Sequence, residues 1–346
     1  MKPSGESEMK ECSVTSAREQ SAKITGLMFA LTYRCCSQCR HCTYSCSSAR
    51  AASMDPPVLH RLLREFDDLK FAGFHGGEPF LCFDTMVAAV KEATARGTTC
   101  EVTTNGFWGG ADTLARRYVA RLKEAGLQRL SVSVDGFHQE FVPFDAVRRA
   151  IALAQDGGIN VCVHAQAFPD GSALNPFDEQ TKALREKLVS EFQIPVQTGR
   201  VQMVGRAIRE LAKYLPMLPV EEALSAGCYF ANEDGALRDP ADRCGLGMNA
   251  SFVIDPYGWV WLCTGIAVGN ATQTSISSII EKRSWNNDEL LSTLLTSGHR
   301  GLLELGIRKG YRPLTGYASK CHLCFHVRKH LQPFYPGSLA PTEIYQ

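Results

Sequence analysis

The sequence predicts an α/β protein: a partial barrel of six βα units followed by a small, cysteine-rich module with a β-hairpin and helices. Short runs rich in β-branched and aromatic residues alternate with segments whose apolar residues recur at helical spacing. The chain has 346 residues, 45% of them hydrophobic, which is enough for one large domain and a smaller one. Six units, rather than the eight of a closed barrel, predict an open sheet.

Each expected strand is a short β-rich run, and each expected helix fills the interval before the next strand. The strands are expected at Ile24–Thr32, Phe71–His75, Thr99–Thr103, Leu130–Val134, Asn160–Phe168 and Val196–Val201. The helices are expected at Asp55–Leu69, Thr85–Arg96, Thr113–Ala125, Phe144–Gln155 and Phe177–Glu191. Repeated right-handed crossovers make such a sheet parallel, and its ligand site lies where the loops meet at the C-terminal strand ends.

Composition and order divide the chain into four parts. Residues 1–22 are polar, without sustained periodicity, and predict a flexible tail. Residues 23–215 carry the βα series, and residues 216–335 carry the cysteine-rich module. Residues 336–346 form a short C-terminal tail.

Three cysteines follow the first expected strand. Cys35, Cys39 and Cys42 are separated by three and then two residues. Three thiolates hold three irons of a four-iron cluster and leave one iron open to a small molecule, which indicates redox catalysis. The alternative is a structural metal knuckle or unrelated thiols, although zinc usually takes four ligands in closely spaced pairs. Cys36 breaks the spacing, so Cys35 is the preferred ligand.

Three further motifs follow the next three strands. They are Gly76-Gly77-Glu78-Pro79, then Thr104-Asn105-Gly106, then the strand Ser131 to Asp135. With the cysteine triad, this order of motifs over about residues 24–206 resembles the radical S-adenosylmethionine (SAM) enzymes. The resemblance implies that the three cysteines ligate a four-iron, four-sulfur cluster whose open iron is chelated by SAM. One electron from that cluster would release a 5'-deoxyadenosyl radical, which abstracts a hydrogen atom from the substrate.

The same motifs supply candidate SAM contacts. Gly76 and Gly77 let the backbone approach a ligand closely, and Glu78 offers an acceptor for an ammonium group. The alternative for this segment is an ordinary turn from strand to helix. Ser133 and Asp135 lie on one strand face, where they can bond ribose hydroxyls. Weaker candidates, each with an equally ordinary role in a turn, core or surface, are His41, Thr104, Asn105, His164 and Arg206.

Three residues are candidates for the reaction on the substrate. His138 and Glu140 follow the fourth expected strand, at the active face, and either can serve as a base. A solvated loop is the alternative at this position. Cys228 is a candidate hydrogen-atom donor or alternative metal ligand, although such a cysteine is more often simply packed.

The C-terminal part contains a second cysteine pattern. Cys244 and Cys263 bracket two β-like runs joined by a turn, Asp255 to Gly258, where proline and glycine favour a tight reversal. Cys321 and Cys324 follow with two residues between them. The pattern resembles the twitch form of the SPASM accessory domain and implies one auxiliary four-iron, four-sulfur cluster. Zinc is the alternative, because four thiolates in two pairs also suit a zinc ribbon.

Composition restricts the partners and the compartment. With 37 basic and 36 acidic residues, the chain has no broad attraction to nucleic acid or to anionic membranes. No apolar run approaches the length of about 18 residues that a membrane helix needs. Fourteen cysteines without an apolar signal segment predict a reducing, cytoplasmic location. Electron supply is expected from a donor such as flavodoxin or ferredoxin.

The sequence leaves three hypotheses for function. The first is maturation of a peptide or protein by crosslinking or epimerisation, with the auxiliary cluster as an electron acceptor or a substrate anchor. The second is dehydrogenation or epimerisation of a small metabolite such as an aminosugar. The 22 polar residues at the N-terminus are too few for a leader-recognition domain, which weakens the peptide hypothesis. The third is a metal-binding scaffold without catalysis.

Overall fold

A computed structural model describes residues 24–168, 175–228, 252–282 and 284–346. The expected N-terminal tail and Cys244 lie outside these residues. In the described part of the chain, no helix is long and apolar enough to cross a membrane.

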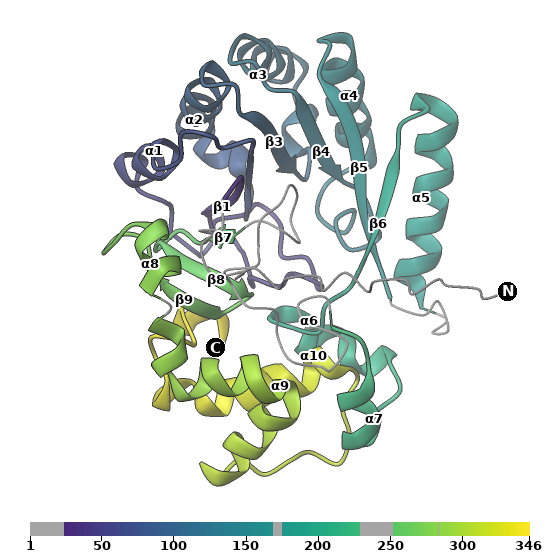
Figure 1. The fold of residues 1–346 in the computed structure, drawn as a ribbon. Coiled ribbons are helices and arrows are strands. Elements are labelled where there is room, and N and C mark those ends of the chain that lie inside the picture. The colour runs from purple at the N-terminus through teal and green to yellow at the C-terminus, as the bar shows by residue number, and fades with distance from the viewer. Residues whose placement is uncertain (1–23, 169–174, 229–251, 283) are drawn as a thin grey trace, which may run out of the picture.

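A single nine-stranded sheet in the order β6-β5-β4-β3-β2-β1-β7-β8-β9 organises the fold (Figure 1). The first six strands pair in parallel, each with the next along the chain, and do not close on themselves. This confirms the predicted partial barrel. The strands are β1 Gly26–Thr32, β2 Phe71–Gly76, β3 Thr99–Thr104, β4 Arg129–Ser133, β5 Asn160–Ala167, β6 Val196–Arg200, β7 Phe252–Ile254, β8 Trp259–Cys263 and β9 Ile266–Asn270.

Five helices follow the parallel strands and cover the outer face of the sheet (Figure 1). They are α1 Pro56–Arg64, α2 Phe83–Ala95, α3 Asp112–Glu124, α4 Phe144–Asp156 and α5 Pro176–Phe192. Each buries one apolar stripe, as the helical spacing predicts. Helix α1 ends before the predicted Leu69, because residues 66–69 turn back so that Phe71 N can bond to the carbonyl of Thr25 at 3.0 Å.

The C-terminal hairpin extends the barrel sheet. Strand β7 pairs in parallel with β1, setting Leu27 opposite Phe252 and Phe29 opposite Ile254, and β8 returns antiparallel to β7. The predicted turn closes through Gly258 N, which bonds the carbonyl of Asp255 at 2.9 Å. Strand β9, of only five residues directly after the hairpin, was not predicted from the sequence.

Helix α6, Arg206–Leu211, follows β6. The helices of the C-terminal module are α7 Val220–Ser225, α8 Ile276–Lys282, α9 Glu289–Arg308 and α10 Lys320–Leu331, with α9 and α10 below the hairpin in Figure 1. Leu218 and Tyr317 exchange two backbone hydrogen bonds of 2.9 Å, which join the segments before α7 and α10. One hydrophobic core continues from Phe29 and Phe74 in the barrel to Trp261 and Leu323 in this module. The hairpin and the barrel therefore share one hydrophobic core.

Candidate functional site

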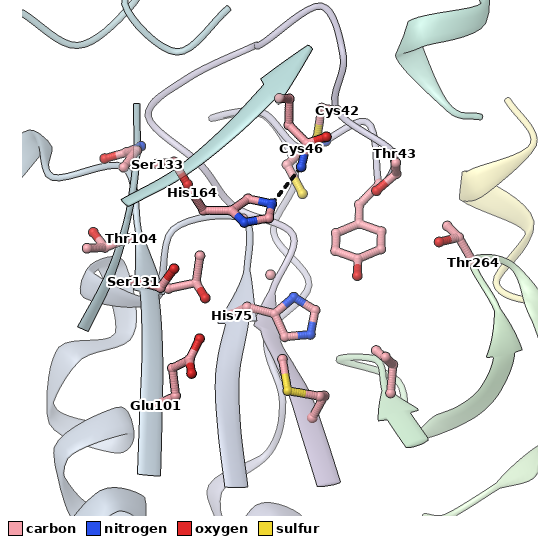
Figure 2. A pocket seen from close by; sticks show the side chains of 18 of the residues that line it. Cys42, Thr43, Cys46, His75, Glu101, Thr104, Ser131, Ser133, His164 and Thr264 are labelled. Carbon is pink, nitrogen blue, oxygen red and sulfur yellow. Dashed lines mark hydrogen bonds between the residues drawn. The ribbon is translucent and has the colours of Figure 1, made fainter. Parts of the chain in front are cut away.

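A cavity of about 880 Å³ runs along the inside of the barrel, from Phe71, Thr99 and Arg129 at strand starts to the loops at the C-terminal strand ends, and reaches the hairpin. Cys35, Cys39 and Cys42 all line it, as do Cys263 and Thr264 from the hairpin side. The structure thus brings the predicted triad and one predicted auxiliary ligand to the walls of the same space. The close-up in Figure 2 shows side chains from the sheet, the cysteine loop and the hairpin around this cavity.

The triad lies in residues 33–54, the cysteine loop, which begins where β1 ends. Cys35 and Cys39 are buried and Cys42 is half-buried. Backbone bonds fold the loop: Cys35 N donates to the carbonyl of Ser47 at 3.0 Å, and Cys42 N donates to the carbonyl of Cys39 at 3.1 Å. These bonds gather three thiols on one side of the cavity.

Arg206 holds the cysteine loop from the opposite side. Its guanidinium donates to the carbonyls of Cys39 at 2.9 Å and Cys46 at 2.6 Å, and its backbone N–H donates to the carbonyl of Cys42 at 3.1 Å. Gly205 has φ +61°, and a side chain there would overlap the carbonyl of Thr43. The guanidinium thus lies on the loop backbone, and Arg206 is absent from the cavity lining. Its predicted contact with SAM remains a prediction.

The glycines after β2 touch the cysteine loop. A Cβ on Gly76 would meet the carbonyl of Thr32, and one on Gly77 would overlap the carbonyl of Arg34. Gly77 N donates to the carbonyl of Thr32 at 2.6 Å, and Glu78 N donates to the carbonyl of Arg34 at 2.9 Å. Their lack of a side chain thus lets two segments of the chain pack closely. Both glycines also line the cavity, and their predicted approach to a ligand stays a prediction.

Glu78 joins two of the predicted motifs. Its side chain is fully buried and accepts from Phe80 N at 3.1 Å, Thr104 Oγ1 at 2.9 Å and Asn105 N at 2.8 Å. Burial raises the pKa of Glu78 to about 7, although these hydrogen bonds lower it in part. Both carboxylate oxygens thus already have partners within the protein. The predicted bond from Glu78 to an ammonium group stays a prediction.

Asn105 faces the cysteine loop. Its Nδ2 lies 3.3 Å from Cys36 Sγ and 3.3 Å from Ser37 Oγ. Thr104 Oγ1 accepts from Gly106 N and from Trp108 Nε1, each at 3.1 Å. Asn105 Oδ1 also accepts from Phe107 N at 3.0 Å, so both residues build the turn. Both also line the cavity, and their predicted contact with SAM stays a prediction.

Asp135 is occupied by neighbours rather than open to the cavity. It is fully buried, and Oδ1 accepts from Phe137 N, from His138 N and from His138 Nδ1, the last at 2.8 Å; Oδ2 accepts from Gln166 N at 3.0 Å. Burial raises the pKa of Asp135, but the charge and hydrogen bonds of His138 outweigh it and hold the pKa well below its usual range. Whether Asp135 contacts a ribose stays a prediction.

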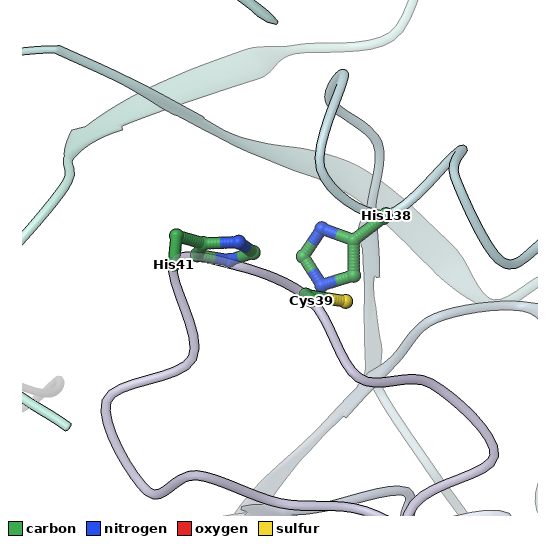
Figure 3. Close-up of side chains that lie close together, drawn as sticks. All are labelled: Cys39, His41 and His138. Carbon is green, nitrogen blue, oxygen red and sulfur yellow. The ribbon is translucent and has the colours of Figure 1, made fainter. Parts of the chain in front are cut away.

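His138 lies beside the triad. Figure 3 shows Cys39, His41 and His138 turned toward one another, and their ligand atoms lie within 4.8 Å of each other. Burial lowers the pKa of His138, but Asp135 more than offsets this and leaves it raised. Burial lowers the pKa of His41 to about 3, so this ring is neutral. His41 and His138 are thus neighbours of a predicted iron ligand.

Of the remaining predicted residues, Ser133 and His164 line the cavity, whereas Glu140 and Cys228 do not. Ser133 and His164 are register partners on β4 and β5, and both line the cavity (Figure 2). Glu140 lies near the surface, where it accepts from Arg40 Nε at 2.9 Å, and it does not line the cavity. Cys228 lies far along the chain, beside Cys321 in the C-terminal module.

Two cavity residues, His75 and Glu101, were not singled out from the sequence, whereas Ser131 begins the predicted motif on β4. His75, Glu101 and Ser131 point into the cavity from adjacent strands (Figure 2). His75 is 8% exposed, and its Nε2 has no hydrogen-bond partner among the described residues. Burial lowers its pKa to about 4, so the ring is neutral. The signal was available: these residues alternate with buried apolar ones along β2, β3 and β4.

The thiols of the C-terminal module also come together. Cys321 opens α10 and Cys324 follows it, while Cys263 ends β8. Burial raises the pKa of Cys321, and nearby Cys228, Cys263 and Cys324 raise it further, which places the four thiols in one neighbourhood. Cys244, the fourth predicted ligand, lies outside the described residues. The structure adds Cys228 to this group.

A buried hydrogen bond links the cysteine loop to the hairpin. Tyr33, two residues before Cys35, donates its hydroxyl to Asp255 Oδ2 at 2.8 Å, and neither residue is exposed. Asp255 Oδ1 accepts from Tyr257 N and Trp259 N at 3.0 and 2.7 Å. Burial raises the pKa of Asp255 from 3.8 to about 7, although these bonds lower it in part.

Replacing Asp255 by asparagine should change how the stability of the apoprotein depends on pH. The folded chain holds the proton of this carboxyl more tightly than the unfolded chain. Its contribution to stability is therefore complete below about pH 4 and is lost as the pH rises through about 7. Between those limits Asp255→Asn should gain stability relative to wild type progressively, by up to about 4 kcal/mol near pH 7, at about 1.4 kcal/mol per pKa unit. Urea unfolding at stepped pH values measures this, and parallel curves for the two proteins would contradict it.

Comparison with known proteins agrees with the geometry. Residues 29–171 match the family described as the Radical SAM superfamily. An AdoMet-dependent heme synthase from Oleidesulfovibrio alaskensis is 25% identical over an alignment of 200 residues that covers 52% of this chain and 49% of that protein. A probable GTP 3',8-cyclase from Methanothermobacter thermautotrophicus is 29% identical over 147 residues, 40% of this chain and 46% of that protein. The chain spans about half the length of the curated relatives it matches.

A solved structure shares the fold. Streptococcus suis SuiB bound to S-adenosylmethionine superposes with a TM-score of 0.53 and 16% identity, over 80% of this chain and 68% of that chain. At this identity the likeness establishes the fold alone. It supports the assignment of the six parallel strands and their outer helices.

Proposed function

Residues 29–171 of this chain belong to the Radical SAM superfamily, and from that premise we propose that the protein reductively cleaves SAM to abstract a hydrogen atom from a substrate. The observation that carries the proposal is the set of three thiols, Cys35, Cys39 and Cys42, gathered on one wall of the cavity. When bound there, a reduced four-iron cluster supplies the electron that converts SAM to methionine and a 5'-deoxyadenosyl radical.

The three thiols fit such a cluster better than a single ion. A tetrahedral zinc ion with Zn–S bonds of about 2.3 Å holds its sulfurs about 3.8 Å apart. Among the described residues, the only group of three or more candidate ligands within 4.8 Å contains just one triad cysteine, Cys39, together with His41 and His138. Since no such group among these residues holds all three triad thiols, a cluster with one open iron fits them better than a single tetrahedral ion.

The surrounding residues fix the loop that bears these thiols. Arg206 binds three of its backbone carbonyls, Asn105 reaches its Cys36 and Ser37, and Gly77 packs against it. Such anchoring holds a reacting group in one geometry and so lowers the entropic part of the barrier. Ser133 and His164 offer polar contacts from the strands opposite. We assign them to SAM, Ser133 to a ribose hydroxyl and His164 to the methionyl carboxylate or the substrate.

Production of 5'-deoxyadenosine tests the proposal. The protein is reconstituted anaerobically with iron and sulfide, reduced with dithionite and given SAM, and the products are separated by chromatography. An enzyme should release 5'-deoxyadenosine and methionine over many minutes even without its substrate, at a low uncoupled rate. A metal-binding scaffold should release neither above the level of the protein-free mixture.

We propose peptide or protein maturation, by crosslinking or epimerisation, as the class of reaction. The support is the resemblance of the C-terminal cysteine pattern to SPASM and twitch modules, whose bearers include peptide-modifying enzymes. The cavity is bounded by the barrel on one side and the hairpin on the other, so a peptide crossing the mouth can place one side chain near the triad. Flavodoxin or ferredoxin is the proposed electron donor.

One observation favours a small metabolite instead. Beyond the residues assigned to SAM, the cavity wall built by β3, β4 and β5 is polar, with Glu101, Ser131 and Gln166 lining it. This wall suits a compact substrate rich in hydroxyl or amino groups, such as an aminosugar, for dehydrogenation or epimerisation. Supplying candidate peptides and aminosugars separately, and measuring which one accelerates 5'-deoxyadenosine formation, separates the two hypotheses.

We further propose one auxiliary four-iron, four-sulfur cluster in the C-terminal module, with Cys244, Cys263, Cys321 and Cys324 as ligands. Replacing Cys321 and Cys324 together by alanine should lower the iron content from about eight to about four per chain. Mössbauer spectroscopy of the reconstituted protein measures this. Full iron content in the variant, or about four irons with retained zinc in the wild type, would mean that this site does not hold a cluster.

A further inference from the structure

Arg328 is a buried cation in the C-terminal module. It lies on α10, one turn after Cys324, and is 1% exposed. Its Nη1 donates to the carbonyl of Thr264 at 2.7 Å and to the Tyr345 hydroxyl at 3.2 Å. The guanidinium also stacks over the rings of Phe325 at 5.5 Å and Tyr345 at 5.7 Å. The side chain is thus held in one place by a carbonyl and two aromatic rings.

The polar contacts of Arg328 do not balance its charge. A guanidinium stays protonated in proteins, and burying an unpaired charge costs several kcal/mol. None of the described residues offers a carboxylate within 4.0 Å of Arg328, whose hydrogen bonds go to neutral oxygens. Its Nε has no hydrogen-bond partner among them. Among the described residues, the Arg328 guanidinium therefore has no partner of opposite charge.

The groups placed to supply that charge are cysteines. Cys263, Cys321 and Cys324 lie close enough to raise the pKa of Arg328, as does Tyr345, while burial alone would lower it. Thr264, whose carbonyl Arg328 binds, directly follows Cys263. As neutral thiols these cysteines contribute no net charge, but as metal-bound thiolates each carries a negative charge. The positive charge of Arg328 is therefore compensated only when a metal cluster is bound to these cysteines.

We propose that Arg328 is the counter-charge of the auxiliary cluster: it stabilises the thiolate-bound cluster and sets a higher reduction potential than the thiolates alone would give. This inference rests on the proposed function, because it requires a cluster at the C-terminal thiols. A fixed positive charge favours the reduced, more negative form of a nearby cluster. The residue thereby sets how readily the auxiliary cluster accepts an electron.

The test uses a background in which only the auxiliary cluster can form. In the Cys35→Ala/Cys39→Ala/Cys42→Ala protein, Arg328 is replaced by methionine, which keeps an unbranched side chain without the charge, or by lysine, which keeps the charge. Each protein is reconstituted with iron and sulfide, and its cluster is titrated potentiometrically by electron paramagnetic resonance. Arg300→Met is the matched control, because Arg300 lies on the surface of α9 and pairs with Glu221.

At a fixed potential, Arg328→Met should lower the ratio of reduced to oxidised cluster about tenfold, which is about 59 mV for one electron. Arg328→Lys should recover most of that shift, and Arg300→Met should leave the ratio unchanged. An unchanged ratio in Arg328→Met would overturn the inference. If the triple-cysteine background binds no iron at all, the auxiliary cluster itself is absent, which is failure of the proposed function and not of the charge argument alone.

Thermal unfolding keeps the inference testable if Arg328→Met loads poorly. In the apoprotein, loss of an uncompensated buried cation should leave the midpoint unchanged or higher than in the background protein. A purely structural arginine would instead give a lower midpoint in the apoprotein. A loss of stability in the apoprotein as large as in the loaded protein would therefore overturn the proposal.

Discussion

Replacing Cys35, Cys39 and Cys42 together by alanine should abolish formation of 5'-deoxyadenosine and lower the iron content from about eight to about four per chain. The three thiols are the cysteines that combine the spacing of the motif with a place on the cavity wall. Without them no open iron is available beside Ser133 and His164. Mössbauer spectroscopy measures the iron, and chromatography measures the nucleoside.

Cys36→Ser is the matched control for this experiment. Cys36 lies in the same loop, is exposed, and contacts Asn105 Nδ2, which can equally donate to a serine hydroxyl. The control should keep its iron and its SAM cleavage. If Cys36→Ser loses both while Cys35→Ala keeps them, the ligand register is shifted by one residue. If the triple variant still releases 5'-deoxyadenosine, the assignment of the catalytic cluster to this loop fails.

Alanine at Gly77 should impair the same site without removing any ligand. An added Cβ would overlap the carbonyl oxygen of Arg34, which is the residue directly before Cys35. Because both partners are backbone, either β2 or the cysteine loop must shift. We expect a loss of about 2 kcal/mol in the free energy of unfolding. We also expect at least a tenfold loss of 5'-deoxyadenosine formation, because a displacement of about 1 Å at a reacting group costs about a hundredfold in rate.

Gly110→Ala provides the comparison for Gly77→Ala. Gly110 also lies in the barrel, its φ is not positive, and a Cβ there would meet only Ala146 at 4.0 Å. Urea unfolding and nucleoside assays on both variants separate a local effect on the site from a general effect of glycine replacement. Equal losses in the two variants, or none in Gly77→Ala, would show that the contact between β2 and the loop does not position the triad.

Much of the fold followed from local pattern. Strand and helix periods in the sequence predicted all six parallel strands, their outer helices and the hairpin turn from Asp255 to Gly258. The βα order and the position of Cys35, Cys39 and Cys42 after the first strand predicted a site at the C-terminal strand ends, where these cysteines line the cavity. These features depend on neighbours in sequence or on the two-residue period of a strand, so one sequence suffices to reveal them.

Partners distant in sequence could not be predicted in this way. Glu78 and Asp135 carry suitable acceptors for a ligand, but their oxygens are taken by Thr104 and Asn105 in one case and by His138 and Gln166 in the other. A sequence shows which residues carry hydrogen-bond donors and acceptors, but not whether each one binds a ligand or another residue of the chain. Only the folded arrangement decides which bonds are made within the chain.

The sequence by itself determined the family resemblance, the order of the strands and the choice of three candidate cluster ligands. The tertiary structure decided that the hairpin shares a sheet with the barrel through β1 and β7, and that Cys228 joins the C-terminal thiols. It also revealed Arg328 as a buried cation beside them. The physical reason is that burial and charge compensation depend on segments far apart in the chain, such as Thr264, Arg328 and Tyr345, which only folding brings into contact.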